Sequence, residues 1–358
     1  MNNKRFNLYD ILVPLIAVVA SLAAGAIIFA LLGKNPITAY YSILQGSGFV
    51  AKAKYGGSQS MLTDFASFVN AWTPLLLASL AVAIALKAGL FNIGVAGQML
   101  LSGFIATITI GYLEMHWLIA KPLALIVGLI VGALVGSLIG YLKHRFNINE
   151  VVSSIMLNYI IQYVVGFFIT TRYINPISRQ SNPVTASARW TLTKYPVGNL
   201  KMDIPLGIVV ALIAAFAIYI LVEKTTLGYE IKAVGLGKRA ARHAGINIYQ
   251  TTIKAMALSG GLAGLAGVTY YMGYYGTIMP RTLAPMGFDA IAVALLGNTH
   301  PIGIIASSFL ISIISSGSTY MRSITGVEAE IAAVIIGIIL LFSACGVFIK
   351  QVITRKKV

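Results

Sequence analysis

Long apolar runs separated by short polar stretches dominate the residue pattern of this chain. A hydrocarbon core about 30 Å thick takes roughly 20 helical residues at about 1.5 Å each, so a run of that length predicts a transmembrane helix. We predict ten spans, with nine as the main alternative because the eighth run is short and interrupted. They cover residues 10–32, 65–86, 91–113, 117–142, 148–172, 204–223, 253–274, 283–297, 301–321 and 329–349. The pattern therefore predicts an all-α fold, a polytopic transmembrane helical bundle with one or two broken helices, in a single domain covering residues 1–358.

The composition identifies lipid as the solvent of this chain. Of its 358 residues, 58% are hydrophobic and 10% are charged, and the mean hydropathy is +0.85. An average soluble protein has about 25% charged residues, so a soluble globular class is excluded. The first apolar run, residues 11–32, is too long for a signal-peptide core, and we interpret it as a retained span.

The distribution of basic residues predicts the orientation in the membrane. Lys and Arg number 26 against 10 Asp and Glu, which gives a net charge of +16. In a multi-span protein such an excess is expected in cytoplasmic loops that face anionic lipid, so we expect lipid and no nucleic acid as a partner. With the amino terminus inside, 15 of the 26 basic residues lie in cytoplasmic stretches, including Lys4, Arg5 and the tail 350–357. We therefore predict that both termini are cytoplasmic, in a multi-pass membrane protein.

Four glycines form a stripe along one face of the fourth predicted span. Gly128, Gly132, Gly136 and Gly140 follow one another at steps of four residues. Small residues at this spacing let helix backbones approach closely in lipid. We predict a packing seam within the chain, and a homodimer seam is the alternative.

Polar residues form a second stripe, on the fifth predicted span. Glu150, Ser154, Asn158 and Gln162 recur every four residues and occupy about one third of the helix circumference. Such a face avoids lipid, so Ser154, Asn158 and Gln162 are candidates for lining a translocation path; for the two amides, bonding to neighbouring helices is an equal alternative. For Glu150 we favour a structural role, in a capping-box-like pair with Asn147 at the helix start.

Glycine and proline interrupt the apolar pattern at two places about 190 residues apart. The first runs from Gly89 to Gly97, and the second begins at Pro285 and continues to Pro301. In transporters, interrupted spans at corresponding positions of two halves mark the permeation pathway. Three further path candidates follow, Asn92, Gln98 and Asp289. The structural alternative for Asp289 is an interaction with the positive end of a short helix.

The longest cytoplasmic stretch, residues 223–252, is too patterned for a simple tether. It predicts a short helix from Lys238 to Ala244, which Gly245 closes in the left-handed conformation. From the residues alone, this segment is either a docking element for a partner or a basic segment on anionic lipid.

Four ordered motifs together resemble one family. They are Lys87-Ala-Gly-Leu-Phe-Asn-Ile-Gly-Val-Ala-Gly-Gln98, Asn149-Glu-Val-Val-Ser-Ser-Ile-Met-Leu-Asn-Tyr159, Ala240-Ala-Arg-His-Ala-Gly-Ile246 and Gly287-Phe-Asp-Ala-Ile-Ala-Val-Ala-Leu-Leu-Gly297. From about Leu75 to the final span, the chain resembles the permease subunit of bacterial ABC importers in the simple-sugar, nucleoside and branched-chain amino-acid group, closest to the nucleoside branch. The chain departs from the family at Ala96, where the pattern usually carries an acidic residue.

The resemblance implies a complex with several partners. It contains two permease chains, the same or sister, two cytoplasmic ABC ATPases and an extracytoplasmic substrate-binding protein, which would dock on loops 33–64 and 173–203. The segment matching residues 228–246 couples the permease to the ATPase in that family. The coupling candidates are Gly228, Tyr229, Gly235, Lys238, Arg239, Ala240, Ala241, Arg242 and Gly245. The implied function is a transmembrane path for a small polar solute, a nucleoside, opened by alternating access; a permease for ribose-like sugars and an ion-coupled secondary transporter that uses Asp289 are the alternatives.

The sequence contains no motif for chemistry of its own. A Walker A loop needs Ser or Thr after GxxxxGK, but Lys34 is followed by Asn35 and Lys238 by Arg239. We therefore expect a transport subunit that is not an enzyme and binds no cofactor, with ATP used by partner subunits. One cysteine, Cys345, and four scattered histidines also predict no metal site.

Overall fold

A computed structural model of the chain describes residues 8–52, 61–197, 200–328 and 330–344. Several predicted features lie outside these residues: Lys4 and Arg5, Cys345, the tail 350–357 and the last residues of the tenth predicted span.

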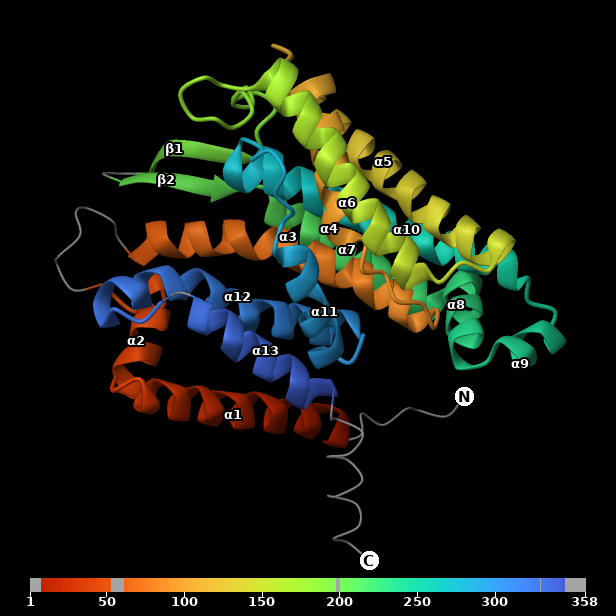
Figure 1. Cartoon of the computed structure of the whole chain (residues 1–358), viewed down its shortest axis with the longest axis horizontal. Coiled ribbons are helices and arrows are strands. Elements are labelled where there is room, and N and C mark those ends of the chain that lie inside the picture. Colours follow the sequence, from red (N-terminus) through yellow and green to blue (C-terminus); the bar gives the residue numbers. More distant parts are fainter. Residues whose placement is uncertain (1–7, 53–60, 198–199, 329, 345–358) are drawn as a thin grey trace, which may run out of the picture. The chain divides into compact units, whose positions relative to one another are not determined.

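Helices make up almost all of the regular structure (Figure 1). They are α1 (Leu8–Leu31), α2 (Pro36–Gly46), α3 (Met61–Lys87), α4 (Val95–Ala106), α5 (Trp117–Phe146), α6 (Glu150–Phe168), α7 (Gly207–Lys224), α8 (Thr226–Leu236), α9 (Lys238–His243), α10 (Ile248–Val268), α11 (Met286–Leu296), α12 (Pro301–Thr325) and α13 (Glu330–Ala344). Three of them continue as π-helical turns, α4 into η1 (Thr107–Gly111), α6 into η2 (Ile169–Tyr173) and α10 into η3 (Thr269–Tyr275). Strand β1 (Thr191–Val197) pairs antiparallel with β2 (Leu200–Pro205).

The predicted fold class, a polytopic transmembrane helical bundle, is confirmed. Within the described residues, six helices are long and apolar enough to cross a membrane: α1, α3, α5, α6, α7 and α12. The shorter α4 with η1, α11 and α13 are apolar too. All nine fall on predicted spans, and the tenth predicted span, 253–274, falls on α10 and η3. The predicted interruptions are also present: residues 88–94 separate α3 from α4, and a non-helical stretch precedes the short α11.

The two long loops contain regular structure that the pattern did not predict. Loop 33–64 holds α2, whose first turn is capped because the backbone N–H of Ile37 donates to Oδ1 of Asn35 at 2.9 Å. Loop 173–203 holds most of the strand pair β1 and β2, which has an irregular register between Leu192 and Tyr195. These elements are small additions to a helical fold.

The predicted cap at the start of α6 is wrong in its residues. Asn149 is the N-cap, and its Oδ1 accepts from the backbone N–H of Val151 at 2.8 Å. Asn147 lies in the left-handed conformation, with φ at 54°, and ends α5. Glu150 instead pairs with Lys143, which lies in the last turn of α5. The ion pair therefore ties the end of α5 to the start of α6.

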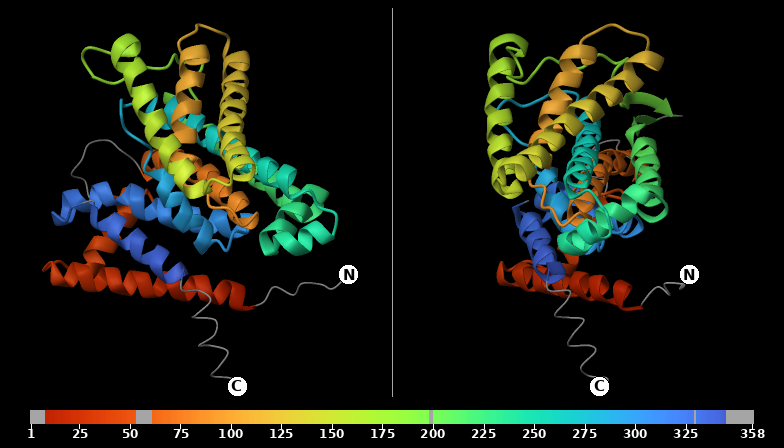
Figure 2. Two further views of the ribbon diagram at one scale, coloured as in Figure 1. Left: turned by 45° about the vertical axis from the view of Figure 1, so that its right-hand side comes forward. Right: turned by 90° about the vertical axis from the view of Figure 1, so that its right-hand side faces the viewer.

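The chain divides into two compact units, residues 69–290 and residues 1–68 with 291–358. In the first unit α5 runs along α10, and α4 packs against α5, α6 and α10 (Figure 2). In the second unit α12 packs on α2, and α13 packs on α1. Phenylalanine rings hold that second core together, since Phe49, Phe68 and Phe309 meet edge to face with centroids 5.3–5.7 Å apart. The candidate coupling segment and all six path candidates lie in the first unit.

Candidate functional site

The candidate coupling segment projects from α7 through a tight helical reversal. Thr225 caps α8 by accepting from the backbone N–H of Gly228 at 3.1 Å, and its hydroxyl donates to the carbonyl of Leu221 at 2.5 Å. Gly228 makes this reversal possible, because a Cβ there would lie 2.6 Å from Cα of Val222. The backbones of α7 and α8 are therefore in direct contact at Gly228.

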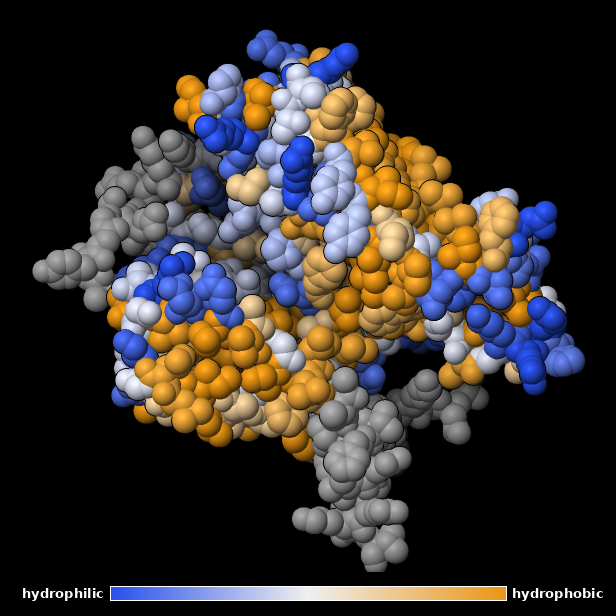
Figure 3. Space-filling model, viewed as in Figure 1, coloured by the Kyte–Doolittle hydropathy of each residue, from blue (hydrophilic) through white to orange (hydrophobic). Residues whose placement is uncertain are grey.

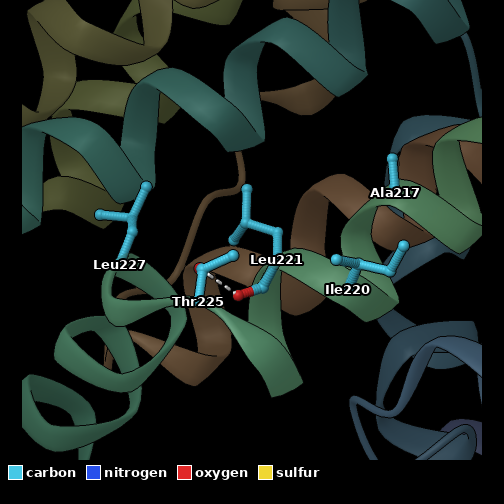
Figure 4. Close-up of a pocket in the computed structure, with 5 residues that line it drawn as sticks. All are labelled: Ala217, Ile220, Leu221, Thr225 and Leu227. Atoms are coloured by element: carbon cyan, nitrogen blue, oxygen red, sulfur yellow. Dashed lines mark hydrogen bonds between the residues drawn. The ribbon is translucent and has the colours of Figure 1, made fainter.

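An apolar groove of about 480 Å³ follows the same reversal (Figure 4). Its lining comes from the last turns of α7 and the first turn of α8. The lining residues are Ala217, Ile220, Leu221, Thr225 and Leu227. The groove offers no charged group, so we assign it no polar ligand.

The short helix predicted after α8 is present as α9. Gly237 separates the two helices in an extended conformation, with φ at 179°. The chain leaves α9 through Gly245, whose φ of 80° is the left-handed conformation predicted for it. Ile246 then donates its N–H to the carbonyl of Ala241 at 3.1 Å, which closes the turn.

Side chains of α8 and α9 form a mixed apolar and basic surface, which we call the docking surface. Leu236 is 91% exposed and Tyr229 is 64% exposed, and a cluster of exposed large side chains is typical of an interaction site. Hydrophilic side chains gather over this end of the first unit (Figure 3). The docking surface consists of the exposed residues Tyr229, Leu236, Lys238, Arg239, Ala240 and Arg242.

Two features of this segment were not predicted from the sequence. Leu236 was missed, although a large apolar residue between Gly235 and Gly237, in a segment predicted to be cytoplasmic, was a signal for it. Ala240 and Ala241 were treated as equivalent, but Ala241 is only 2% exposed and belongs to the interior of the segment. Of these two alanines, Ala240 is the one whose side chain a partner can contact.

Three of the path candidates form a buried group of polar side chains rather than an open lining. Asn92, which is 1% exposed, donates to Oε1 of Gln98 at 3.1 Å and to Oγ of Ser259 at 2.9 Å. Asn158 accepts from the backbone N–H of Gly97 at 2.9 Å and donates to the carbonyl of Ile93 at 3.0 Å. We call Asn92, Gln98, Asn158 and Ser259 the amide cluster; the sequence pattern did not identify Ser259.

The amide cluster ties three helices to the interrupted segment 88–94. Its members come from that segment, α4, α6 and α10, and Ser259 also donates to the carbonyl of Ala81 in α3 at 2.7 Å. In this conformation the side chain of Asn158 forms hydrogen bonds with backbone groups of Gly97 and Ile93. Bonding to neighbouring helices was one of the two interpretations that the sequence left open for it. Buried amides with partners rigidify a structure, so the cluster is a brace across the first unit.

In the part of the chain that the structure describes, the remaining path candidates form no hydrogen bond with the amide cluster, although Ser154 packs beside Gly94, next to Asn92. Ser154 is fully buried and donates to the backbone carbonyl of Glu150. Gln162 is half-buried, and its Nε2 donates to the carbonyl of Arg281 at 2.6 Å. Asp289 is half-buried in the first turn of α11, where a carboxylate interacts favourably with the helix dipole.

The glycine stripe of α5 faces α10 within the same chain. A Cβ at Gly132 would lie 2.9 Å from Cα of Gly264, and a Cβ at Gly136 would lie 3.0 Å from Cα of Gly260. Gly128 likewise approaches Gly264, and Gly140 approaches Ile253 and Met256. The two backbones approach more closely than larger residues allow.

Ala96 occupies a position without room for an acidic side chain. It is 0% exposed, and a Cβ at Gly287 would lie 2.7 Å from its Cα and its Cβ. The start of α11 therefore fills the space that a longer side chain at residue 96 would need. This packing gives a physical reason for the departure from the resembled pattern.

Comparisons with known proteins extend over the whole chain. A protein-family model described as "Branched-chain amino acid transport system / permease component" matches residues 65–344. The nucleoside ABC transporter permease protein NupB of Lactococcus lactis subsp. cremoris is 34% identical over 365 residues, an alignment that covers 100% of this chain and 96% of the relative. The guanosine ABC transporter permease protein NupP of Bacillus subtilis is 33% identical, over 98% of this chain and 97% of the relative. The glucose ABC transporter permease protein TsgB13 of Haloferax volcanii is 29% identical, over 94% of this chain and 88% of the relative.

Proposed function

We propose a function from one premise: this chain belongs to the family of permease components of branched-chain amino acid transport systems, whose model covers residues 65–344. The resemblance drawn from the four motifs is thereby confirmed. The chain is a multi-pass plasma-membrane protein and the permease subunit of an ABC importer. It is a transport subunit and not an enzyme.

The solute that we propose is a nucleoside. The observation that carries this proposal is the similarity over nearly the full length of both chains to two relatives that are named for nucleosides and for guanosine, at 34% and 33% identity. Simple sugars are the second candidate, because the glucose permease relative aligns with 94% of this chain. Both solutes are small and polar.

For the transport cycle we propose alternating access, driven by a separate ATPase. The docking surface supports this proposal, because it presents exposed Tyr229 and Leu236 beside basic residues on two helices that project from α7. ATP binding would close the ATPase pair, and the movement of α8 and α9 would switch which side of the path is open. A second permease chain, the same or sister, completes the proposed path, and an extracytoplasmic binding protein delivers the solute.

Uptake into cells that contain the complete importer tests the solute. Radiolabelled guanosine and uridine are offered, and unlabelled nucleosides, ribose and glucose are added in excess as competitors. We expect uptake that depends on this chain and is suppressed by nucleosides but not by the sugars. Uptake of radiolabelled ribose or glucose that depends on this chain, without uptake of the nucleosides, would select the sugar candidate. Uptake that follows an ion gradient after the ATPase has been deleted would refute the ABC mechanism.

A further inference from the structure

The end of α8 touches the interrupted segment 88–94 through two glycines. A Cβ at Gly235 would lie 3.0 Å from the amide N of Gly89 and would also run into the carbonyl of Lys87. A Cβ at Gly89 would lie 3.2 Å from Cα of Gly235. Gly89 also has a φ of 69°, the left-handed conformation that glycine adopts without strain. The contact is backbone against backbone.

The turn at Gly89 leads directly into the amide cluster. Leu90 donates its N–H to the carbonyl of Ala85 at 2.9 Å, which fixes the turn on the end of α3. Two residues later comes Asn92, whose side chain bonds to Gln98 and Ser259. The carbonyl of Ile93 then accepts from Asn158. From residue 88 onward the segment is thus held at successive positions by α3, α4, α6 and α10.

We propose that Gly89 and Gly235 are positioning residues that carry movement from the docking surface to the amide cluster. This inference rests on the proposed function, because it needs an ATPase that moves α8. A flexible side chain at such a contact would absorb a displacement by changing rotamer, but two backbones in van der Waals contact transmit it. The segment 88–94 then shifts against its hydrogen-bond partners. The amide cluster senses the state of the docked ATPase without touching it.

A hydrogen bond between α8 and α10 does not reach the amide cluster in this way. Oγ1 of Thr251, in the first turn of α10, donates to Oε2 of Glu230 at 3.3 Å. That link joins two polar side chains at the beginning of α10, far along the helix from Ser259. It anchors α8, whereas the glycine contact meets the interrupted segment itself.

Gly235→Ala tests the contact, with Gly237→Ala as the matched control. The added Cβ at residue 235 meets the carbonyl of Lys87, which cannot move aside like a side chain. At residue 237 the backbone is extended and the nearest atom, Cβ of Ala240, is 4.0 Å away, so alanine fits. The two positions lie on either side of Leu236. A difference between the variants therefore reports on the contact and not on the composition of the segment.

The readout is the number of ATP molecules hydrolysed for each solute transported, measured on the complete importer in proteoliposomes. Coupling between two sites is typically about 5- to 150-fold, so we expect Gly235→Ala to raise this ratio at least about fivefold while the ATPase still co-purifies. Gly237→Ala is expected to keep the wild-type ratio. Equal ratios for the two variants would overturn the inference.

Hydrogen exchange of the wild-type importer provides an independent test that does not depend on a variant folding. We expect protection of the amides of residues 88–98 to change when ATP binds. Unchanged protection there, with altered protection in α8 and α9, would also overturn the inference. If the wild-type chain neither transports nor binds an ATPase, the proposed function fails first, so the two failures are distinguishable.

Discussion

Gly132→Ala is expected to separate α5 from α10 and to lower the thermal stability of the solubilised chain. The added Cβ would lie 2.9 Å from both Cα and the amide N of Gly264, nearer than ordinary van der Waals contact. The obstructing atoms belong to the backbone of the facing helix and cannot rotate away. The helices must therefore move apart along the seam.

The magnitude follows from two opposing contributions. Overpacking a close-packed interior costs about 1–3 kcal/mol, and rigid backbone neighbours place Gly132→Ala at the upper end of that range. Replacing glycine by alanine in a helix returns about 1 kcal/mol. The net loss is about 2 kcal/mol. In a long chain 1 kcal/mol corresponds to about 2 °C, so the apparent Tm should fall by about 4 °C.

The assay is the fraction of the chain that stays monodisperse in size-exclusion chromatography after heating. Gly261→Ala is the control within α10, because its Cβ would lie 3.5 Å from the nearest atom, the carbonyl oxygen of Leu129. That variant should keep or slightly raise the wild-type Tm. A Tm for Gly132→Ala equal to that of the wild type, or equal losses in both variants, would refute the packing argument.

Three further changes test the docking surface and the amide cluster. Leu236→Asp introduces a charge at a position that is 91% exposed, so it should reduce co-purification of the ATPase at least tenfold without lowering the Tm. The control Ile177→Asp, at a residue that is 95% exposed in loop 173–203, should leave co-purification and Tm unchanged. Retained co-purification of the ATPase with Leu236→Asp would contradict the assignment of the docking surface. Ala240→Glu should likewise weaken ATPase binding at unchanged Tm, because residue 240 is exposed. Ala241→Glu should lower the Tm, because residue 241 is buried. The same Tm and the same ATPase binding in both variants would contradict the structure. Asn92→Ala leaves the backbone N–H of Gly94 without its side-chain acceptor, which costs about 1–3 kcal/mol of stability. The Tm should therefore fall by at least about 2 °C. An unchanged Tm would show that the amide cluster is not a brace.

The transmembrane helices, the glycine stripe of α5 and the left-handed turn at Gly245 were predicted from the sequence, because each depends on residues that lie close together in the chain. A transmembrane helix requires a run of apolar residues, and a close helix contact requires small residues on one face, so both can be read from spacing along the sequence. The stripe of Gly132 and its neighbours illustrates this, since the residues that it predicts to pack are those that meet α10. The left-handed turn at Gly245 follows from glycine chemistry in the same way.

Features that depend on distant partners could not be predicted. Asn92 and Ser259 are 167 residues apart in the chain, and no periodicity connects them, so the sequence pattern did not identify Ser259 as the partner of Asn92. The cap of α6 was misplaced by two residues because Asn147 and Asn149 both suit a helix boundary. Only the geometry shows that Asn147 ends α5 and that Asn149 begins α6. The strand pair was missed because β1 and β2 lie in a long loop whose alternation is broken by an irregular register.

The central claim is that this chain is a gated path whose energy comes from a separate ATPase bound to α8 and α9. Its most direct test is solute uptake into proteoliposomes reconstituted with the permease and binding protein, with and without the ATPase subunits and ATP. The account predicts uptake only when ATP and the ATPase are both present, and loss of that uptake in Leu236→Asp. Uptake of equal rate in vesicles without the ATPase would contradict it.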